Sequence, residues 1–351
     1  MQTEFLIIGQ GVSGTWLSYY LQKEKRSFVV IDNSQKNSAS RVAAGIINPV
    51  TGRRIVKTWM IDELIKSIFP AYEQFGMDMR ISSIQKTSLI DFHPTPQMKL
   101  AFDDRLKENA DFLFQSSDQN KYRDIFNYDF GFGEVVPCYI VNLKDILAIW
   151  RKSLLQNEQL LEENFEINQL QHQNGKVIYK NIIADKLIFC DGISSSQSFF
   201  FKNLPFALNK GEAMFIHSEE LPETNIFKKG MMLTHIGDNQ YWIGSNYLWD
   251  FKDDQPSDQF RKQVTQLLDS WLKVPYKIVD HLASIRPANV ERRPFVGFHP
   301  VHKNIGILNG MGTKGCSLAP YFAKQLTDNQ ISQRPILPEA DINRFAKILQ
   351  R

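Results

Sequence analysis

The sequence is poor in cysteine, and the three cysteines it has, Cys138, Cys190 and Cys316, stand far apart. An odd number at this spacing excludes a disulfide framework, and no CxxC pair or cluster of cysteine with histidine indicates zinc. We therefore expect no metal site. Unpaired cysteines are typical of a reducing compartment, so we expect a cytoplasmic protein.

Long apolar runs and a leader segment are also absent from the sequence. No stretch approaches the roughly 18 consecutive apolar residues that a membrane-spanning helix needs. The first residues, Met1–Gly14, lack the basic region, apolar region and small-residue cleavage site of a secretory signal. We expect neither membrane association nor a removable leader.

Charge of one sign is not in excess. Lysine and arginine number 41 against 38 for aspartate and glutamate, which gives a formal net charge of +3. Nucleic-acid binding needs a broad basic surface, so this balance argues against a nucleic-acid partner. The chain has 351 residues, of which 43% are hydrophobic and 12% aromatic, so it can form one or two well-packed domains.

A glycine-rich motif dominates the first fifty residues. An apolar strand predicted at Glu4–Ile8 leads into Gly9-Gln10-Gly11-Val12-Ser13-Gly14, which matches GxGxxG. A helical pattern follows from Val12 to about Lys23, and a second predicted strand, Ser27–Ile31, ends at Asp32. A strand, turn, helix and strand with a terminal acid are the context that a dinucleotide-binding site requires.

Each part of the motif has a physical task in binding a dinucleotide. Gly9 permits the tight turn, Gly11 lets the backbone approach a pyrophosphate, and Gly14 lets the helix lie close to the strand. Asp32, 18 residues after Gly14, can accept hydrogen bonds from a ribose, which favours FAD or NAD over NADP. The predicted contacts also include Val12, Ser13 and Asn33. The alternative is a glycine-rich turn that binds no ligand.

The segment after the second predicted strand differs from the regular continuation of a nicotinamide-binding domain. Residues 38–49 are small, contain a glycine and show no periodicity, so their backbone can lie close to a large ligand. Ser40 and Arg41 can reach a pyrophosphate through a hydroxyl and a guanidinium. The next predicted contacts are Ala43, Ala44 and Gly45. The alternative is a plain surface loop.

A second strand, glycine-rich turn and helix stand near the other end of the chain. A strand predicted at Ile305–Leu308 precedes residues 309–320 and a helix that runs to about Thr327. The N-terminus of this helix can stabilise negative charge on a reduced flavin. The predicted cofactor contacts in the turn are Gly310, Gly312, Thr313, Lys314 and Gly315. An ordinary helix with a glycine-rich entry is the alternative.

Together these motifs resemble those of the FAD-dependent oxidoreductases of the D-amino-acid oxidase superfamily, which includes glycine oxidase and sarcosine oxidase. The order and spacing of the matching segments carry the resemblance over nearly the whole chain. The segments are Gly9–Gly14 with Asp32, Ser40–Gly45, Leu187–Ser194, Gly211-Glu212, Tyr241–Ser245, Arg286–Pro294 and Gly310–Pro320.

The resemblance implies an α/β fold with two domains interleaved along the chain. A Rossmann-like FAD-binding domain of the glutathione-reductase type takes residues 1–57, 136–205 and 285–351. An α+β substrate domain with an antiparallel sheet takes residues 58–135 and 206–284.

Several elements are predicted in the middle of the chain. Asn142–Leu155 has the pattern of an amphipathic helix, and Asn164–Leu170 with Lys176–Tyr179 has that of a hairpin. Ala213–His217 and Gln240–Ser245 alternate as strands of the substrate-domain sheet should. Core and loop packing is expected for Tyr72, Phe75 and the phenylalanines between 112 and 132. The resemblance places Ile167, Asp191 and Gly192 against FAD.

The resemblance also indicates which residues take part in the chemistry. Arg286 stands where the amino-acid oxidases carry the arginine that pairs with the substrate carboxylate, and its planar fork suits that task. Lys314 lies beside the expected flavin edge, where a cation favours anionic reduced flavin and can activate oxygen. A structural ion pair for Arg286 and a solvated loop for Lys314 are the alternatives.

Two further expectations concern the substrate pocket and the flavin linkage. Arg53, Arg54 and Lys57 follow the cofactor loop and can hold a dianionic or bulky substrate close to Arg286, unless they form a solvated basic loop. Sarcosine oxidase attaches its flavin through a cysteine in the region that matches His281–Ile285. No cysteine stands there, so we expect non-covalent FAD.

The resemblance implies a flavoenzyme that oxidises the C–N bond of a small amino or imino acid, or of a related carboxylate-bearing amine, by hydride transfer to flavin N5. Oxygen, a quinone or another protein can take the electrons. The alternatives are a flavin oxidase acting on a carboxymethylamino group of tRNA, a nicotinamide-dependent dehydrogenase, and a non-catalytic FAD-binding protein.

Overall fold

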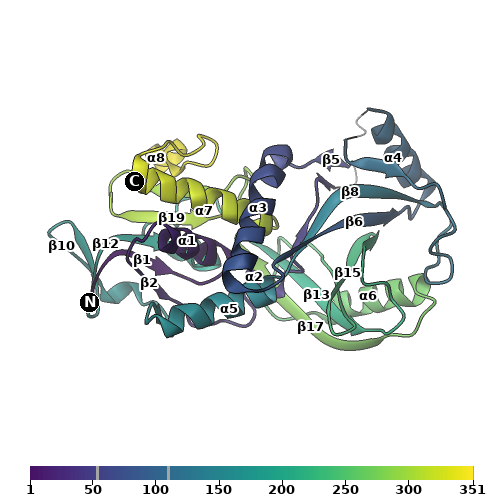
Figure 1. Cartoon of the computed structure of the whole chain (residues 1–351), viewed down its shortest axis with the longest axis horizontal. Helices are drawn as coiled ribbons and strands as arrows, with labels where there is room; N and C mark the ends of the chain where they lie inside the picture. Colours follow the sequence, from purple (N-terminus) through teal and green to yellow (C-terminus); the bar gives the residue numbers. More distant parts are fainter. Residues whose placement is uncertain (53–54, 109–110, 351) are drawn as a thin grey trace.

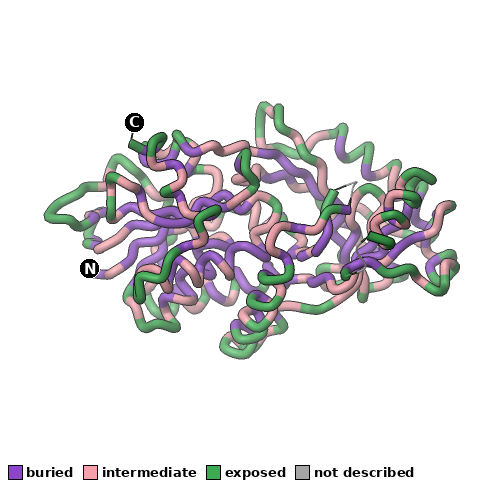
Figure 2. Tube along the Cα trace, turned by 90° about the horizontal axis from the view of Figure 1, so that it is seen from above, coloured by how far each residue is buried: buried purple, intermediate pink, exposed green. Residues whose placement is uncertain are grey.

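The computed structural model describes residues 1–52, 55–108 and 111–350. It has two lobes, each built on one β-sheet (Figure 1). One lobe holds both termini and the sheet containing β1 (Gln2–Ile8), and the other holds the sheet containing β6 (Ile84–Phe92) and β8 (Phe132–Val141). Buried residues fill the interior of both lobes, whereas exposed residues lie mainly on the peripheral loops and helices (Figure 2).

The first sheet runs in the order β10-β11-β12-β1-β2-β9, and β19 continues it beside β12 with β18 outside. Its further strands are β2 (Phe28–Ile31), β9 (Leu160–Leu161), β10 (Leu170–Gln173), β11 (Lys176–Tyr179), β12 (Ile182–Phe189), β18 (Phe295–Phe298) and β19 (Ile305–Asn309). β12, β1, β2 and β9 are parallel neighbours, and β19 is parallel to β12. The apolar runs predicted as buried strands at the start of the chain are therefore confirmed.

Three long helices pack against this sheet: α1 (Val12–Lys23), α5 (Leu143–Gln156) and α7 (Gly315–Ser332). The predicted helices are confirmed, and α7 extends past its expected end to Ser332. Asn142 caps α5 because its side chain accepts from Asp145 N at 3.2 Å. The buried ring of Trp16 in α1 meets Tyr72 of α3 (Ile61–Met79) edge to face at 4.9 Å, which joins α3 to the core of this lobe.

The predicted hairpin is half right. β11 matches the predicted second strand, but the first strand is Leu170–Gln173, and the predicted strand at Asn164–Leu170 is wrong. The two-residue turn decides the register: Asn174 and Gly175 both have positive φ, so Gln173 pairs with Lys176. Pairing with the short β11 then ends at Leu170, and the residues before it form the 3-10 helix η1 (Ile167–Gln169).

The second sheet runs in the order β17-β13-β16-β15-β14-β6-β8-β3, with β7 beside β8. Its other strands are β3 (Ile46–Ile47), β7 (Leu113–Gln115), β13 (Asn209–His217), β14 (Ile226–Lys229), β15 (Met231–Gly237), β16 (Gln240–Gly244) and β17 (Lys277–Arg286). All neighbours are antiparallel except β6 and β14. The two strands predicted for this sheet are confirmed as β13 and β16.

The helix α6 (Asp258–Trp271) covers one face of the second sheet, and its apolar side joins a core rich in aromatic rings. Phe92, Phe126, Phe132 and Trp271 are fully buried in that core. Tyr72 and Phe75 are fully buried in the first lobe. The core packing predicted for these aromatic residues is thus confirmed, although Phe114 is exposed.

The remaining elements complete the described residues. They are α2 (Ala39–Val42), β4 (Val50–Thr51), β5 (Val56–Lys57), α4 (Pro96–Glu108), η2 (Gly192–Gln197), η3 (Ile342–Phe345) and α8 (Ala346–Leu349). The α/β fold class is confirmed. The domain boundaries remain a prediction: the one placed at residue 136 falls inside β8, and β3 pairs with β8 in the second sheet. Among the helices described, none is long and apolar enough to span a membrane.

Candidate active site

The parallel strands of the first sheet end at one edge, and the predicted cofactor residues follow these ends. Gly9 follows β1, Asp32 follows β2, Asp191 comes shortly after β12, and Gly310 follows β19. Gly9 N donates to Ile31 O at 2.8 Å, which joins the first two turns. The carboxyl edge of a parallel sheet is where α/β folds of this kind bind ligands.

The glycines of the first turn are required by close backbone contacts. Gly9 has a φ of +96°, and a Cβ there would lie 2.6 Å from the carbonyl oxygen of Cys190. A Cβ on Gly14 would lie 1.9 Å from the carbonyl oxygen of Gly9. Only glycine therefore lets α1 begin this close to β1, with Gly11, Val12 and Ser13 at its N-terminus.

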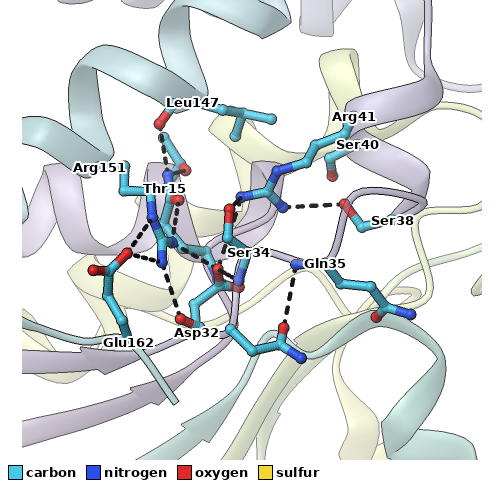
Figure 3. A network of polar contacts seen from close by, with 12 residues as sticks. Thr15, Asp32, Ser34, Gln35, Ser38, Ser40, Arg41, Leu147, Arg151 and Glu162 are labelled. Atoms are coloured by element: carbon cyan, nitrogen blue, oxygen red, sulfur yellow. Dashed lines mark hydrogen bonds and ion pairs between the residues drawn. The ribbon is translucent and has the colours of Figure 1, made fainter. Parts of the chain in front are cut away.

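Asp32 is held by backbone amides and arginines at the end of β2 (Figure 3). Its Oδ2 accepts from Gln10 N at 2.8 Å, and its Oδ1 accepts from Ser34 N at 2.8 Å. Oδ1 also accepts from Arg151 Nη1 at 2.7 Å, while Arg41 Nη2 lies 3.7 Å from it. The predicted ribose acid thus has one fixed orientation at the sheet edge.

Arg151, on α5, is a site residue that the sequence analysis missed. Its Nη2 donates to Asp32 O at 3.1 Å and to Glu162 Oε1 at 2.8 Å, and its Nη1 donates to Gln10 Oε1 at 3.3 Å (Figure 3). It lies 119 residues from Asp32 in the chain, so no local motif connects the two. The one available signal was a basic residue on the predicted amphipathic helix.

The loop after β2 folds back onto the start of α1. Ser40 Oγ accepts from Val12 N at 3.0 Å, and Arg41 Nη1 donates to Ser38 Oγ at 3.2 Å. Figure 3 shows Ser38, Ser40 and Arg41 above the Asp32 network. The structure therefore gathers these predicted residues around the first turn of α1.

The second sheet fixes the other end of this loop. Trp242 of β16 donates from Nε1 to Val42 O at 2.9 Å, directly before Ala43, Ala44 and Gly45. Gly45 O accepts from Val141 N at 2.9 Å, where β8 passes. The predicted cofactor loop is thus held between the two lobes.

Two further cofactor contacts are predicted at Asn33 and Ile167. Asn33 Nδ2 donates to Asn164 Oδ1 at 2.5 Å, which joins the end of β2 to the segment before η1. Ile167 follows on η1 with 45% of its surface exposed. Its contact with the cofactor remains a proposal.

Asp191 and Gly192 meet the turn into α7. Asp191 accepts from Ser195 Oγ and from Asn309 Nδ2, and Gly192 O accepts from Asn309 Nδ2 at 2.8 Å. Burial raises the pKa of the Asp191 carboxyl to about 7, against the lowering effect of the Ser195 hydrogen bond. An acid that is only partly ionised near neutral pH can therefore lie beside the glycine-rich edge without a full negative charge.

The turn into α7 is tied to the segment that follows β17. Gly310 N donates to Asn309 Oδ1 at 2.8 Å, and Gly312 N donates to Pro287 O at 3.2 Å. Thr313 is exposed, and Gly315 begins α7 against Val12 of α1. The two glycine-rich turns from opposite ends of the chain therefore lie next to each other.

Lys314 occupies the N-cap position of α7, close to the cations Arg292 and Arg293. Burial lowers the pKa of Lys314, and Arg293 and Arg292 lower it further by repulsion. Within the described ranges, none of these three side chains forms an ion pair with a carboxylate. Their charge is available to an anion.

Arg286 ends β17 and lies among neutral acceptors. Its Nη1 donates to Asn209 Oδ1 at 2.7 Å and to Asn246 O at 3.2 Å, and its Nη2 donates to Ser245 Oγ at 2.7 Å. The ring of Tyr247 lies 5.0 Å from the guanidinium carbon. Burial lowers the pKa of Arg286, and none of the carboxylates in the described part of the chain pairs with it.

Gly211 makes room for this guanidinium. A Cβ at Gly211 would lie 1.7 Å from Arg286 Nη2 and 2.0 Å from its Cζ. The pairing of β13 with β17 places Asn209 opposite Arg286, so both side chains and Gly211 share one face of the second sheet. Gly211 was predicted only as part of a motif, and neither this role nor that of Asn209 followed from the sequence.

Of the three basic residues predicted beside Arg286, the structure describes Lys57, which pairs with carboxylates close to it. Lys57 Nζ lies 2.7 Å from Asp62 and 3.7 Å from Asp111, and the hydrogen bond with Asp62 raises its pKa. Its charge is thus matched within its own lobe. Arg53 and Arg54 lie outside the described residues.

The residues at the edge fit the negative charge of a bound dinucleotide. Neither α1 nor α7 has an acidic residue in its first turn or a side-chain cap, so both N-termini can face negative charge. Asp32, the predicted ribose acid, lies at the same edge, and Ser40 bonds to Val12 at the start of the first of these helices.

A glycine-rich turn on a helix N-terminus, an acid after the next strand and a second sheet facing the same edge define a dinucleotide-binding oxidoreductase. The chain belongs to the DAO family: the family model described as FAD dependent oxidoreductase matches residues 4–329. The protein is therefore an FAD-dependent oxidoreductase with the cofactor that the sequence predicted.

Solved structures share this fold at low sequence identity. Glycine oxidase from Geobacillus kaustophilus superposes with a TM-score of 0.80 at 15% identity, covering 98% of both chains. Iminodiacetate oxidase from Chelativorans sp. BNC1 gives 0.77 at 16% identity, again over 98% of both chains. L-proline dehydrogenase from P. horikoshii gives 0.76 at 14% identity, over 99% of this chain and 98% of the other.

Proposed function

We propose that this flavoenzyme oxidises the C–N bond of a small amino or imino acid whose carboxylate binds to Arg286. The observation that carries the proposal is a half-buried guanidinium that has only neutral partners among the described residues. A cation removed from water without a counter-charge is costly, and a bound carboxylate would offset that cost.

The unused hydrogen-bond donors of Arg286 support a bidentate partner. A guanidinium has five N–H donors, and Asn209, Asn246 and Ser245 accept three of them. The donors left include Nε–H and one on Nη2. A single carboxylate can accept two N–H groups of one guanidinium.

The position of Arg286 relates the substrate to the cofactor. The chemistry that FAD would supply, when bound, is acceptance of a hydride from the carbon next to the substrate nitrogen. Arg286 would fix the other end of the substrate, and the bond between Gly312 N and Pro287 O ties its segment to the α7 turn. Lys314, with no carboxylate partner among the described residues, would favour negative charge there.

Relatives of known activity favour this substrate class. The similar structures include a glycine oxidase, an iminodiacetate oxidase and an L-proline dehydrogenase, named for substrates that carry a nitrogen next to a carboxylate. These neighbours include both oxidases and a dehydrogenase, so oxygen and quinone acceptors have to be compared directly.

Anaerobic bleaching of the flavin tests the proposal. The holoprotein is mixed without oxygen with amino acids, N-methyl amino acids, imino acids and 2-hydroxy acids, and the flavin absorbance is followed. We expect at least one amino or imino acid to reduce the flavin. The proposal would be contradicted if only hydroxy acids reduced the flavin, or if no compound of the panel did. Reoxidation with oxygen or a quinone then separates an oxidase from a dehydrogenase.

We also propose that FAD is bound without a covalent link. The region His281–Ile285 contains no cysteine. Cys316 lies in the first turn of α7, but burial raises the pKa of its thiol to about 12, so it is a poor nucleophile. Acid precipitation should leave the yellow colour in the supernatant, whereas a yellow pellet would indicate a covalent bond.

A further inference from the structure

The side chain of Glu212 is a buried carboxylate directly behind the Arg286 site. Glu212 is 0% exposed and pairs with Ala283 in the sheet, while Asn209 pairs with Arg286. Because side chains alternate along a strand, Gly211 lies on the face of Arg286 and Glu212 on the opposite face. Gly211 of β13 therefore leaves room for the guanidinium on one face of the sheet, and the side chain of Glu212 points to α6 on the other face.

Four donors surround the Glu212 carboxylate. Oε1 accepts from Ser257 Oγ at 2.8 Å and from Asn246 Nδ2 at 3.1 Å. Oε2 accepts from Ser257 N at 2.6 Å and contacts His281 Nε2 at 3.1 Å. Burial lowers the pKa of His281, so its neutral ring can donate a hydrogen bond from Nε2 to Glu212 Oε2. Among the described residues, no lysine or arginine pairs with this carboxylate.

Asn246 connects Glu212 to the other face of the sheet. Its Nδ2 donates to Glu212 Oε1, and its Oδ1 accepts from Glu212 N at 2.8 Å, so both ends of the amide are held. Its own carbonyl oxygen accepts from Arg286 Nη1 at 3.2 Å. The side chain of Asn246 thus belongs to the Glu212 network, while its backbone belongs to the Arg286 site.

The segment around Asn246 depends on this connection. Ser245, Asn246 and Tyr247 contact the guanidinium one after another, through a hydroxyl, a carbonyl and a ring. They follow the last residue of β16, and their described backbone atoms form no hydrogen bond to other backbone until Leu248 pairs with Lys210. Side-chain bonds therefore keep these three residues in place.

We propose that Glu212 is a positioning residue for substrate binding: it holds Asn246, and through Asn246 the groups that orient Arg286. The inference rests on the proposed function, because it concerns the carboxylate that Arg286 would bind. Without an acceptor at position 212, the segment 245–247 would loosen, and the guanidinium would sample other orientations. Carboxylates should then bind more weakly, with FAD still in place.

The test measures binding of benzoate, a carboxylate with no oxidisable C–N bond, by its effect on the flavin spectrum of the holoprotein. Glu212→Met, which has no acceptor, should raise the Kd about tenfold or more. Glu212→Gln keeps one acceptor oxygen and should give an intermediate Kd. If Glu212→Met does not fold, Asn246→Ala removes the same connection at a less buried position and should also weaken binding.

A matched control separates positioning from stability. Asp91 is a buried carboxylate of β6 that pairs with Lys228 at 2.7 Å, and no described contact joins it to Arg286. Asp91→Asn should lower the thermal midpoint and leave the Kd for benzoate unchanged. An unchanged Kd in both Glu212→Gln and Asn246→Ala would overturn the inference.

A double-variant cycle distinguishes this inference from the proposed function. If Glu212 acts through Arg286, Glu212→Gln should have no further effect on the Kd once Arg286→Ala is present. Additive effects would overturn the positioning role. If the single variant Arg286→Ala leaves the Kd for benzoate unchanged, the proposed function is contradicted. If Arg286→Ala raises the Kd but the Glu212 variants do not, only the positioning role of Glu212 is contradicted.

Discussion

The guanidinium of Arg286 lies directly against Gly211, where a Cβ would come within 1.7 Å of Nη2. Glycine at this position is therefore part of the anion site, although it has no side chain to bind anything. The clash would be with the flexible end of an arginine, so the backbone of β13 need not move.

We expect Gly211→Ala to displace the Arg286 guanidinium and weaken carboxylate binding. The Kd for benzoate should rise about tenfold or more, because the bonds to Asn209 and Ser245 cannot all be kept. The FAD content and the thermal midpoint should change little. Spectral titration and thermal unfolding of the holoprotein check this. Unchanged affinity would show that the guanidinium has room elsewhere.

Arg151 should contribute to FAD affinity by fixing Asp32. Removing the guanidinium in Arg151→Met leaves Asp32 Oδ1 with one hydrogen bond, from the Ser34 amide, and with Arg41 Nη2 at 3.7 Å, so its orientation toward a ribose is less firmly set. We expect the Kd for FAD to rise about tenfold, measured by reconstitution of the apoprotein.

A matched control for this prediction lies at the other end of the same sheet. Arg26 Nη2 contacts Glu4 at 2.5 Å, and both side chains are about one-third exposed. Arg26→Met should leave FAD affinity unchanged, since an exposed ion pair contributes little. Equal losses in Arg26→Met and Arg151→Met would contradict a specific role for Arg151.

The first part of the cofactor site was predictable because its signal is local. β1, the GxGxxG turn, α1 and Asp32 lie within about thirty residues, and the space next to Gly9 and Gly14 is taken by backbone atoms. Arg286 was predictable through its motif. Its partners were not, because Asn209 and Ser245 reach it through strand pairing across 77 and 41 residues.

The errors have equally specific causes. The strand predicted at Asn164–Leu170 gave way to a 3-10 helix because the turn at Asn174-Gly175 sets where β10 and β11 can pair. The substrate-pocket role of Lys57 stays a prediction, although the chain folds Asp62 beside it. Charge clusters in a sequence do not show which carboxylates will neutralise them.

Asp191 should make stability depend on pH. Its carboxyl has a pKa of about 7 in the folded protein against 3.8 as the ordinary value, because burial disfavours the charge. The folded state therefore keeps a proton that the unfolded chain releases, and the stability gained at low pH is lost as pH rises from about 4 to about 7.

The substitution Asp191→Asn should remove this dependence while keeping an acceptor for Ser195. At pH 8 the variant should be more stable than the wild-type apoprotein by about 4 kcal/mol, and at pH 4 the two should be similar. Denaturant unfolding at the two pH values checks the sign. A variant equally or less stable at pH 8 would contradict the burial argument.

The central proposal is that Arg286 binds the carboxylate of the substrate. The direct test is an anaerobic flavin-bleaching titration of wild type and Arg286→Ala with the best amino or imino acid substrate and with its methyl ester. We predict that Arg286→Ala raises the half-saturating concentration of the acid at least about a hundredfold and leaves that of the ester, and the FAD content, nearly unchanged. Equal responses of acid and ester to the substitution would contradict the central claim.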